Sequence, residues 1–68
     1  MKDFGERLKE LRNGLGMSQK DMASSIGVTA SAYANYEHGT REPNLEKLVK
    51  ICEVLDVSAD HLLGIEEW

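Results

Sequence analysis

The stretch SQKDMASSIGVTASAYANYEHG, residues 18–39, decides the fold of this chain. Ser18 and Asp21 have the spacing of a capping box, in which a hydroxyl and a carboxylate three residues later satisfy the first backbone N–H groups of a helix. The helix that they open has its apolar residues on one side: Met22, Ala23 and Ile26. Gly27 interrupts this pattern, so we expect a short helix followed by a tight turn.

A second short helix is expected directly after that turn. Thr29 is its predicted N-cap and Gly39 its predicted C-terminal stop. Tyr33 and Tyr36 are three residues apart, which places both on one helix face, and we expect that face to be buried. Two short helices joined by a tight turn are typical of a helix-turn-helix, here residues 19–38, whose second helix can enter the major groove of DNA.

The flanking sequence adds three more helical segments and no strand-like alternation. One precedes the motif, with apolar residues every three or four positions: Phe4, Leu8, Leu11 and Leu15. A second follows the motif, with Asn44 as its predicted cap and an apolar stripe predicted to face the core: Leu45, Leu48, Val49, Cys52 and Leu55. Ser58 is the predicted cap of the last helix. We therefore expect one all-α domain over residues 1–68, with its core in residues 4–64.

The charge balance excludes a strongly basic protein. The 68 residues carry a formal net charge of −4, and the acidic excess lies in residues 44–68. A generic polyanion binder would be basic, so contact with nucleic acid requires a local surface. No apolar run approaches the roughly 20 residues of a membrane helix, no signal-peptide core is present, and Cys52 has no partner for an internal disulfide. These features favour a cytoplasmic protein.

Several of these positions, in this order, resemble the Cro/C1 (XRE-type) family of helix-turn-helix repressors. The resemblance covers about residues 4–64, and its most specific parts are Ser18-Gln19, Ala23, Gly27, Glu37-x-Gly39, Arg41-x-Pro43 and Val57-Ser58-x-x-x-Leu62-Leu63. It implies an all-α, five-helix, lambda-repressor-like DNA-binding domain with a helix-turn-helix. It further implies a sequence-specific transcriptional regulator, expected to be a repressor, with residues 30–36 as its recognition helix.

The resemblance also implies roles for individual residues. Contacts with the DNA backbone would come from residues that flank the recognition helix: Ser18, Gln19, His38, Thr40 and Arg41. The groove would be faced by Thr29, Ala30, Ser31, Ala34 and Asn35. In family members an arginine near the end of the first helix pairs with the glutamate that ends the third, and those positions here are Arg12 and Glu37.

The recognition face departs from many relatives, which carry Arg, Lys or Gln where this chain has Ala30 and Ser31. Asn35 is the expected base contact, because an asparagine amide can bind adenine bidentately; the alternative is a solvated surface asparagine. Ala30 and Ala34 fit either a contact with thymine methyl groups or a simple helix-forming role. Ser31 can hydrogen-bond to almost any acceptor and therefore discriminates little.

The expected partner is a double-stranded operator, palindromic, bound by a homodimer whose half-sites are about 34 Å apart. The expected dimer contact involves Ile65, Trp68 and the end of the last helix. The alternative is a protein-interaction module or anti-repressor on the same fold, favoured by the acidic C-terminal third and the uncharged recognition face. No cofactor or metal is expected, because His38 and His61 lack ligand partners at suitable spacing, and no residue pattern supports an enzyme.

Overall fold

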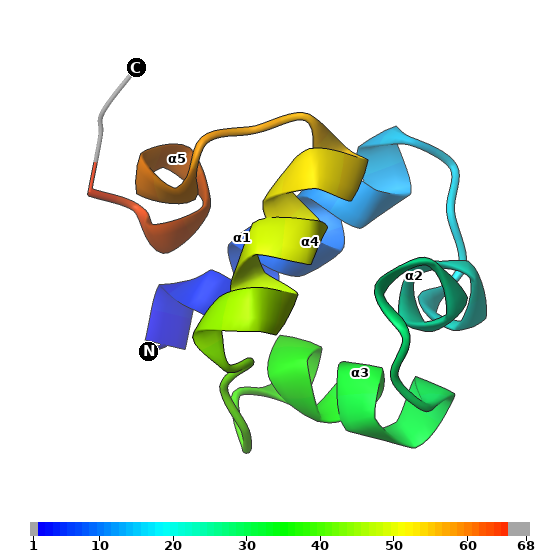
Figure 1. Ribbon diagram of the computed structural model, residues 1–68. Helices are drawn as coiled ribbons and strands as arrows, with labels where there is room; N and C mark the ends of the chain where they lie inside the picture. Colours follow the sequence, from blue (N-terminus) through cyan, green and yellow to red (C-terminus); the bar gives the residue numbers. More distant parts are fainter. Residues whose placement is uncertain (1, 66–68) are drawn as a thin grey trace.

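The structure is a computed structural model that describes residues 2–65, and it confirms the expected all-α, five-helix fold (Figure 1). The helices are α1 (Lys2–Gly14), α2 (Gln19–Ile26), α3 (Ala30–His38), α4 (Leu45–Leu55) and α5 (Ala59–Leu63). In Figure 1, α3 lies along the lower edge of the bundle, α4 crosses its front, and α1 runs behind α4. None of the helices in the described part of the chain is long and apolar enough to cross a membrane.

The predicted caps of the helix-turn-helix are confirmed. Ser18 Oγ accepts a hydrogen bond from the backbone N–H of Asp21 at 3.0 Å, and Asp21 Oδ2 accepts one from the N–H of Ser18 at 3.1 Å. Thr29 Oγ1 likewise accepts from the N–H of Ala32 at 3.0 Å. Both helices end at a glycine in the left-handed region, Gly27 with φ 76° and Gly39 with φ 82°, where a side chain would be strained. These local bonds fix both ends of each short helix.

The core draws on all five helices. Its fully buried large side chains are Leu8, Met22, Ile26, Tyr33, Ile51 and Leu62. Ala23 of α2 is also in this core, with 2% of its surface exposed, and Val28 packs against the core from the turn. Because the two helices of the motif share this core with α1, α4 and α5, their relative orientation is set by the whole bundle.

The predicted apolar stripe of α4 is only partly correct. Leu55 is buried, but Leu45 is 79% exposed and Val49 is 57% exposed, whereas Ile51, outside the predicted stripe, is fully buried. The helix packs against α2 and α5 on its Ile51 side, which turns Leu45 and Val49 outward. The predicted stripe of α1 has a similar error at its end, because α1 stops at Gly14 and leaves Leu15 exposed.

A glycine lets α1 approach the end of α3. A Cβ atom added to Gly5 would overlap the backbone carbonyl oxygen of Glu37, and it would also press on the carbonyl of Tyr36. Since the obstacle is backbone, no side-chain rotation can make room. Gly5 therefore allows a direct backbone contact between α1 and the C-terminal turn of α3.

Candidate nucleic-acid interface

The predicted recognition helix, α3, has one face fixed in the core and one face open. Tyr33 is fully buried and Tyr36 is 8% exposed; their rings meet edge to face, with centroids 6.2 Å apart. The other face carries five residues that are exposed or half-buried: Ala30, Ser31, Ala34, Asn35 and His38. The helix runs two residues beyond the predicted recognition segment 30–36, so His38 belongs to α3 itself.

The arginine and glutamate that the resemblance paired lie in contact. Arg12 Nε donates to Glu37 Oε2 at 2.6 Å, and Arg12 Nη2 donates to Glu37 Oε1 at 3.1 Å. This is a bidentate pair, and the side chains are only 9% and 2% exposed. Arg12 Nη1 also donates to the carbonyl of Met17 at 2.8 Å. The pair thus joins the end of α1 to the end of α3 and to the loop before α2.

Two further groups bind the same carboxylate. Gln19 Nε2 donates to Glu37 Oε1 at 3.0 Å, and the Tyr33 hydroxyl donates to Glu37 Oε2 at 2.6 Å. Neither contact was predicted from the sequence, although the four-residue spacing of Tyr33 and Glu37 on one helix was a usable signal. Glu37 therefore accepts hydrogen bonds from α1, α2 and α3 together and holds the helix-turn-helix as one unit.

The electrostatics of this cluster keep Glu37 ionised. Burial opposes ionisation of the carboxyl, but the hydrogen bonds from Arg12, Tyr33 and Gln19 outweigh it and hold the pKa of Glu37 below its usual value. The hydrogen bond to Glu37 raises the pKa of Arg12, and burial together with the bond to Glu37 raises that of Tyr33. An acid close to the candidate DNA surface is thus compensated within the protein.

The turn after α3 is anchored on a single carbonyl. The backbone oxygen of Asn35 accepts from the N–H groups of Gly39 at 3.0 Å, Thr40 at 3.1 Å and Arg41 at 3.3 Å, and from Thr40 Oγ1 at 3.3 Å. Thr40 and Arg41 are both exposed. Because their backbone is bound to the middle of α3, they are held beside its open face.

The start of α2 lies on the same side of the motif. Ser18 is exposed, and Gln19 is half-buried with its amide nitrogen bonded to Glu37 of α3. The first N–H groups of a helix attract anions. Lys20, which was not among the predicted DNA contacts, is exposed in this first turn of α2. The structure therefore gathers the start of α2, the open face of α3 and the following turn around one surface.

The described residues show neither a cluster of metal ligands nor an activated thiol. Within residues 2–65, no three His, Cys, Asp or Glu side chains gather as metal ligands. Cys52 is half-buried, and burial raises the pKa of its thiol, which disfavours a reactive thiolate.

The bundle is all-helical, and a tight turn joins α2 to α3, whose outer face is open. This arrangement defines the class of helix-turn-helix domains. The chain belongs to the helix-turn-helix family HTH_3, whose family profile matches residues 8–62. The resemblance inferred from the sequence is thereby confirmed.

Two curated relatives illustrate the likeness. The chain is 48% identical over 60 residues to the SPbeta prophage-derived uncharacterized HTH-type transcriptional regulator YonR of Bacillus subtilis, covering 88% of this chain and 56% of that protein. It is 41% identical over 59 residues to the cryptic phage CTXphi transcriptional repressor RstR of Vibrio cholerae, covering 87% and 53%. The chain thus spans about half the length of these relatives.

Two solved structures share the fold. The DNA-binding domain of the P22 C2 repressor has a TM-score of 0.83 at 33% identity, covering 88% of this chain and 79% of that one. The restriction-modification controller protein C.AhdI from Aeromonas hydrophila has a TM-score of 0.82 at 35% identity, covering 88% and 91%. The lambda-repressor-like fold expected from the sequence is therefore confirmed.

Proposed function

We propose that this chain is a sequence-specific DNA-binding regulator of transcription, acting as a repressor, that inserts α3 into the major groove. The observation that carries this proposal is the division of α3. Its inner face is fixed by Tyr33, Tyr36 and Glu37, and its outer face carries residues that are exposed or half-buried. Support also comes from relatives named as transcriptional regulators or repressors and from the DNA-binding domain of the P22 C2 repressor.

We assign base contacts to the outer side of α3 and phosphate contacts to its surroundings. The proposed groove-facing residues are Thr29, Ala30, Ser31, Ala34 and Asn35. The proposed backbone-contacting residues are Ser18, Gln19, His38, Thr40 and Arg41. Phosphate contacts fix position and base contacts specify sequence, so a recognition face without Arg or Lys is compatible with selective binding. The short side chains also allow α3 to lie close to the floor of the groove.

The net charge of −4 sets the expected strength of binding. Neutralised phosphates supply most of the non-specific affinity of a DNA-binding protein, and this chain offers few cations for that purpose. A single domain should therefore bind weakly. We propose that two copies bind a palindromic operator as a homodimer, in the cytoplasm, with half-sites about 34 Å apart.

The test is selection of bound duplexes from a random pool, followed by binding measurements over a series of salt concentrations. We expect enrichment of a two-fold symmetric sequence and an affinity that falls as salt rises. No enrichment at low salt would overturn the proposal. If the chain showed no such enrichment and formed a stable complex with a protein partner, the result would support the alternative function of a protein-interaction module.

A matched pair of variants separates binding from folding. Ser31→Glu places an acid in the first turn of α3, where it favours the helix but would repel phosphate. Ser24→Glu makes the same change at an exposed position of α2 outside the proposed surface. We expect Ser31→Glu to abolish enrichment and Ser24→Glu to retain it. Equal binding by both variants would remove α3 from the interface.

A further inference from the structure

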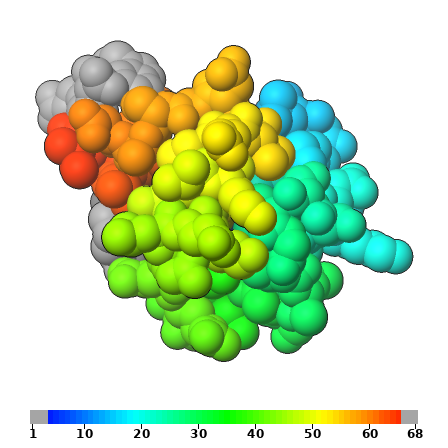
Figure 2. Space-filling view, viewed as in Figure 1, coloured from blue at the N-terminus to red at the C-terminus, as the bar shows by residue number. Residues whose placement is uncertain are grey.

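The side chain of Lys47 reaches from the first turn of α4 to the turn that joins α2 and α3. Asn44 Oδ1 accepts a hydrogen bond from the backbone N–H of Lys47 at 2.8 Å, which fixes this residue in the first turn of α4. At the far end of the side chain, Nζ lies 3.6 Å from the point where a Cβ atom on Gly27 would stand. Figure 2 shows the yellow-green start of α4 beside the green segment that contains this turn. An ammonium group from α4 therefore lies at the helix-turn-helix.

This ammonium group is held in place but has few partners within the protein. The Lys47 side chain is only 20% exposed, so most of its aliphatic stem is covered. Within residues 2–65, Nζ donates no hydrogen bond, and its one ion pair is with Glu46 Oε1 at 3.8 Å. The Glu46 side chain is 74% exposed, so solvent screens that pair. Lys47 thus presents a fixed positive charge whose hydrogen-bond donors are available to a ligand.

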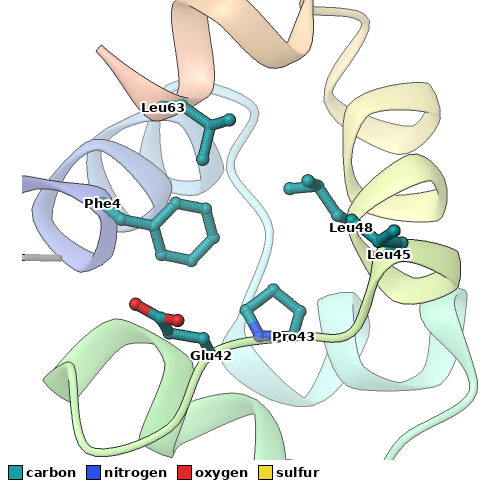
Figure 3. A pocket seen from close by; sticks show the side chains of 6 residues that line it. All are labelled: Phe4, Glu42, Pro43, Leu45, Leu48 and Leu63. Atoms are coloured by element: carbon teal, nitrogen blue, oxygen red, sulfur yellow. The ribbon is translucent and has the colours of Figure 1, made fainter. Parts of the chain in front are cut away.

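The apolar side chains of the same turn of α4 face elsewhere. Leu45 and Leu48 line a hollow of about 180 Å³ together with Phe4, Glu42, Pro43 and Leu63 (Figure 3). Lys47 is not part of this lining, because successive residues of a helix are rotated by about 100°. The first turn of α4 therefore directs apolar side chains toward α1 and α5 and its ammonium group toward the helix-turn-helix.

The position of the charge relative to α3 makes a DNA phosphate the expected ligand. Thr29, the N-cap of α3, follows Gly27 by two residues, so their Cα atoms are no more than about 8 Å apart. The ammonium group at Gly27 is therefore close to the start of α3. The major groove is about 12 Å wide, and a helix with its side chains is about 10–12 Å across. A helix that fills the groove has phosphates along both of its sides, within reach of a cation placed there.

Resting on the proposed DNA-binding function, we propose that the ammonium group of Lys47 binds a phosphate of the DNA backbone beside the first turn of α3. The backbone contacts assigned above lie at the start of α2 and at the end of α3. Lys47 adds one at the start of α3, from a helix outside the motif. Arg12 is committed to Glu37, and the net charge is −4, so a single well-placed cation supplies a large share of the phosphate binding. Phosphate contacts fix orientation on the duplex, and this one fixes the entry of α3.

The alternative for the same ammonium group is a structural role at the end of α2. Gly27 is the C-cap of α2, and the last turn of that helix has no basic residue. A cation at this end offsets the partial negative charge of the helix C-terminus. The two roles differ in what they change. A phosphate contact changes the salt dependence of DNA binding, whereas a charge at the helix end changes the stability of the free protein.

The first test is the salt dependence of binding by Lys47→Met, which keeps the stem and removes the charge. We expect the slope of log affinity against log salt to become shallower by about 0.9, so that the loss of affinity grows about eightfold between 1 M and 0.1 M salt. Lys50→Met is the matched control, because it makes the same change at an exposed position of α4, and its slope should stay unchanged. An unchanged slope in Lys47→Met would overturn the contact. If that variant were also less stable in denaturant unfolding, Lys47 would have the structural role alone.

A second measurement locates the phosphate. Duplexes that carry one uncharged methylphosphonate at each backbone position in turn are bound by the unchanged chain and by Lys47→Met. We expect one position in each half-site to weaken the unchanged chain and to have no effect on the variant. If every position weakened both proteins equally, the Lys47 contact would be overturned and the proposed function would stand. Absence of sequence-specific binding by the unchanged chain would overturn both.

Discussion

Helices α3 and α4 are consecutive in the chain and of similar length, but their exposed surfaces differ in composition. α3 is held by a few strong inward contacts, those of the two tyrosines and the Glu37 carboxylate, and its outer side carries alanine and uncharged polar side chains with His38 at the end. α4 is apolar over most of its circumference and buries one side of it at Ile51 and Leu55. The comparison shows two ways to leave a surface available. In α3, the contacts that fix the helix all lie on its inner face, so the outer face is left open. In α4, the apolar residues are more than the core can cover, so some of them stay exposed.

The largest expected effect is on stability, and it comes from removing the carboxylate that fixes α3 to the rest of the bundle. Glu37→Ala removes a carboxylate that is 2% exposed and leaves the guanidinium of Arg12 unpaired. Stranding one partner of a buried pair costs about 3–5 kcal/mol, and we expect a loss of that size in denaturant unfolding. Glu46→Ala is the matched control, because that side chain is 74% exposed and its pair with Lys47 spans 3.8 Å. A loss below about 1 kcal/mol in Glu37→Ala, the range of surface pairs, would contradict the central role of Glu37.

The next effect sharpens the description of α4. Ile51→Ala creates a cavity in the core and should lower the free energy of unfolding by about 2–5 kcal/mol. Val49→Ala, at an exposed position of the same helix, should change it by no more than about 0.5 kcal/mol. Thermal unfolding of the two variants measures the difference. Equal losses of unfolding free energy in the two variants would mean that Val49 belongs to the core as well.

A change on the outer face of α3 should affect recognition and leave stability intact. Asn35→Ala keeps the backbone carbonyl that anchors the following turn and removes the side-chain amide. We expect it to lower affinity for the selected sequence by about 1–3 kcal/mol and to relax specificity at one base position. A scan of single base substitutions measures both. An unaltered preference at every position would rule out a base contact by Asn35.

The Glu37 cluster also predicts a pH dependence. Because the folded state holds the pKa of Glu37 below its ordinary value of 4.5, this group stabilises the fold above that pH, and its contribution is lost as the pH falls through the folded pKa. Glu37→Gln should lack this part of the acid destabilisation. Unfolding free energies between pH 7 and pH 3 in both proteins give the difference, which separates Glu37 from other acids such as Asp21. Parallel curves would contradict the assignment.

The smallest effect concerns the turn after α3. Arg41→Ala should weaken binding similarly for all sequences and make the dependence of log affinity on log salt shallower by about 0.9, the value of one phosphate contact. Lys50→Ala is the matched control, because it removes one positive charge from an exposed position of α4 that is outside the proposed phosphate contacts. Its slope on a single half-site should stay unchanged. An unchanged slope in Arg41→Ala would remove that residue from the phosphate contacts.

Much of the fold could be predicted from the sequence, because its signals are local. Ser18, Thr29, Asn44 and Ser58 each bond a backbone N–H three residues later, and such caps are visible in sequence without tertiary information. The burial of Tyr33 and Tyr36 followed from their spacing. The open face of α3 followed from the same helix geometry.

Other features depend on how helices cross, and the sequence alone does not fix that. The rotation of α4 decides whether Leu45 or Ile51 enters the core, and seven apolar residues on one helix leave both choices open. The bonds of Gln19 and Tyr33 to Glu37 require three helices to converge. The predicted dimer contact at Ile65 and Trp68 stays a prediction: Ile65 is 69% exposed, and Trp68 lies outside the described residues.

The close approach at Gly5 has a consequence for the depth of groove insertion. The backbone of α1 rests against the last turn of α3 with no side chain between them, so the separation of the two helices is the smallest that the chain permits. A methyl group at position 5 would act as a spacer and shift the end of α3, together with the turn that is bound to it, relative to α1 and the start of α2. The distance by which α3 stands out from the bundle, and with it the proposed reach of its short side chains toward the bases, thus depends on one absent carbon atom.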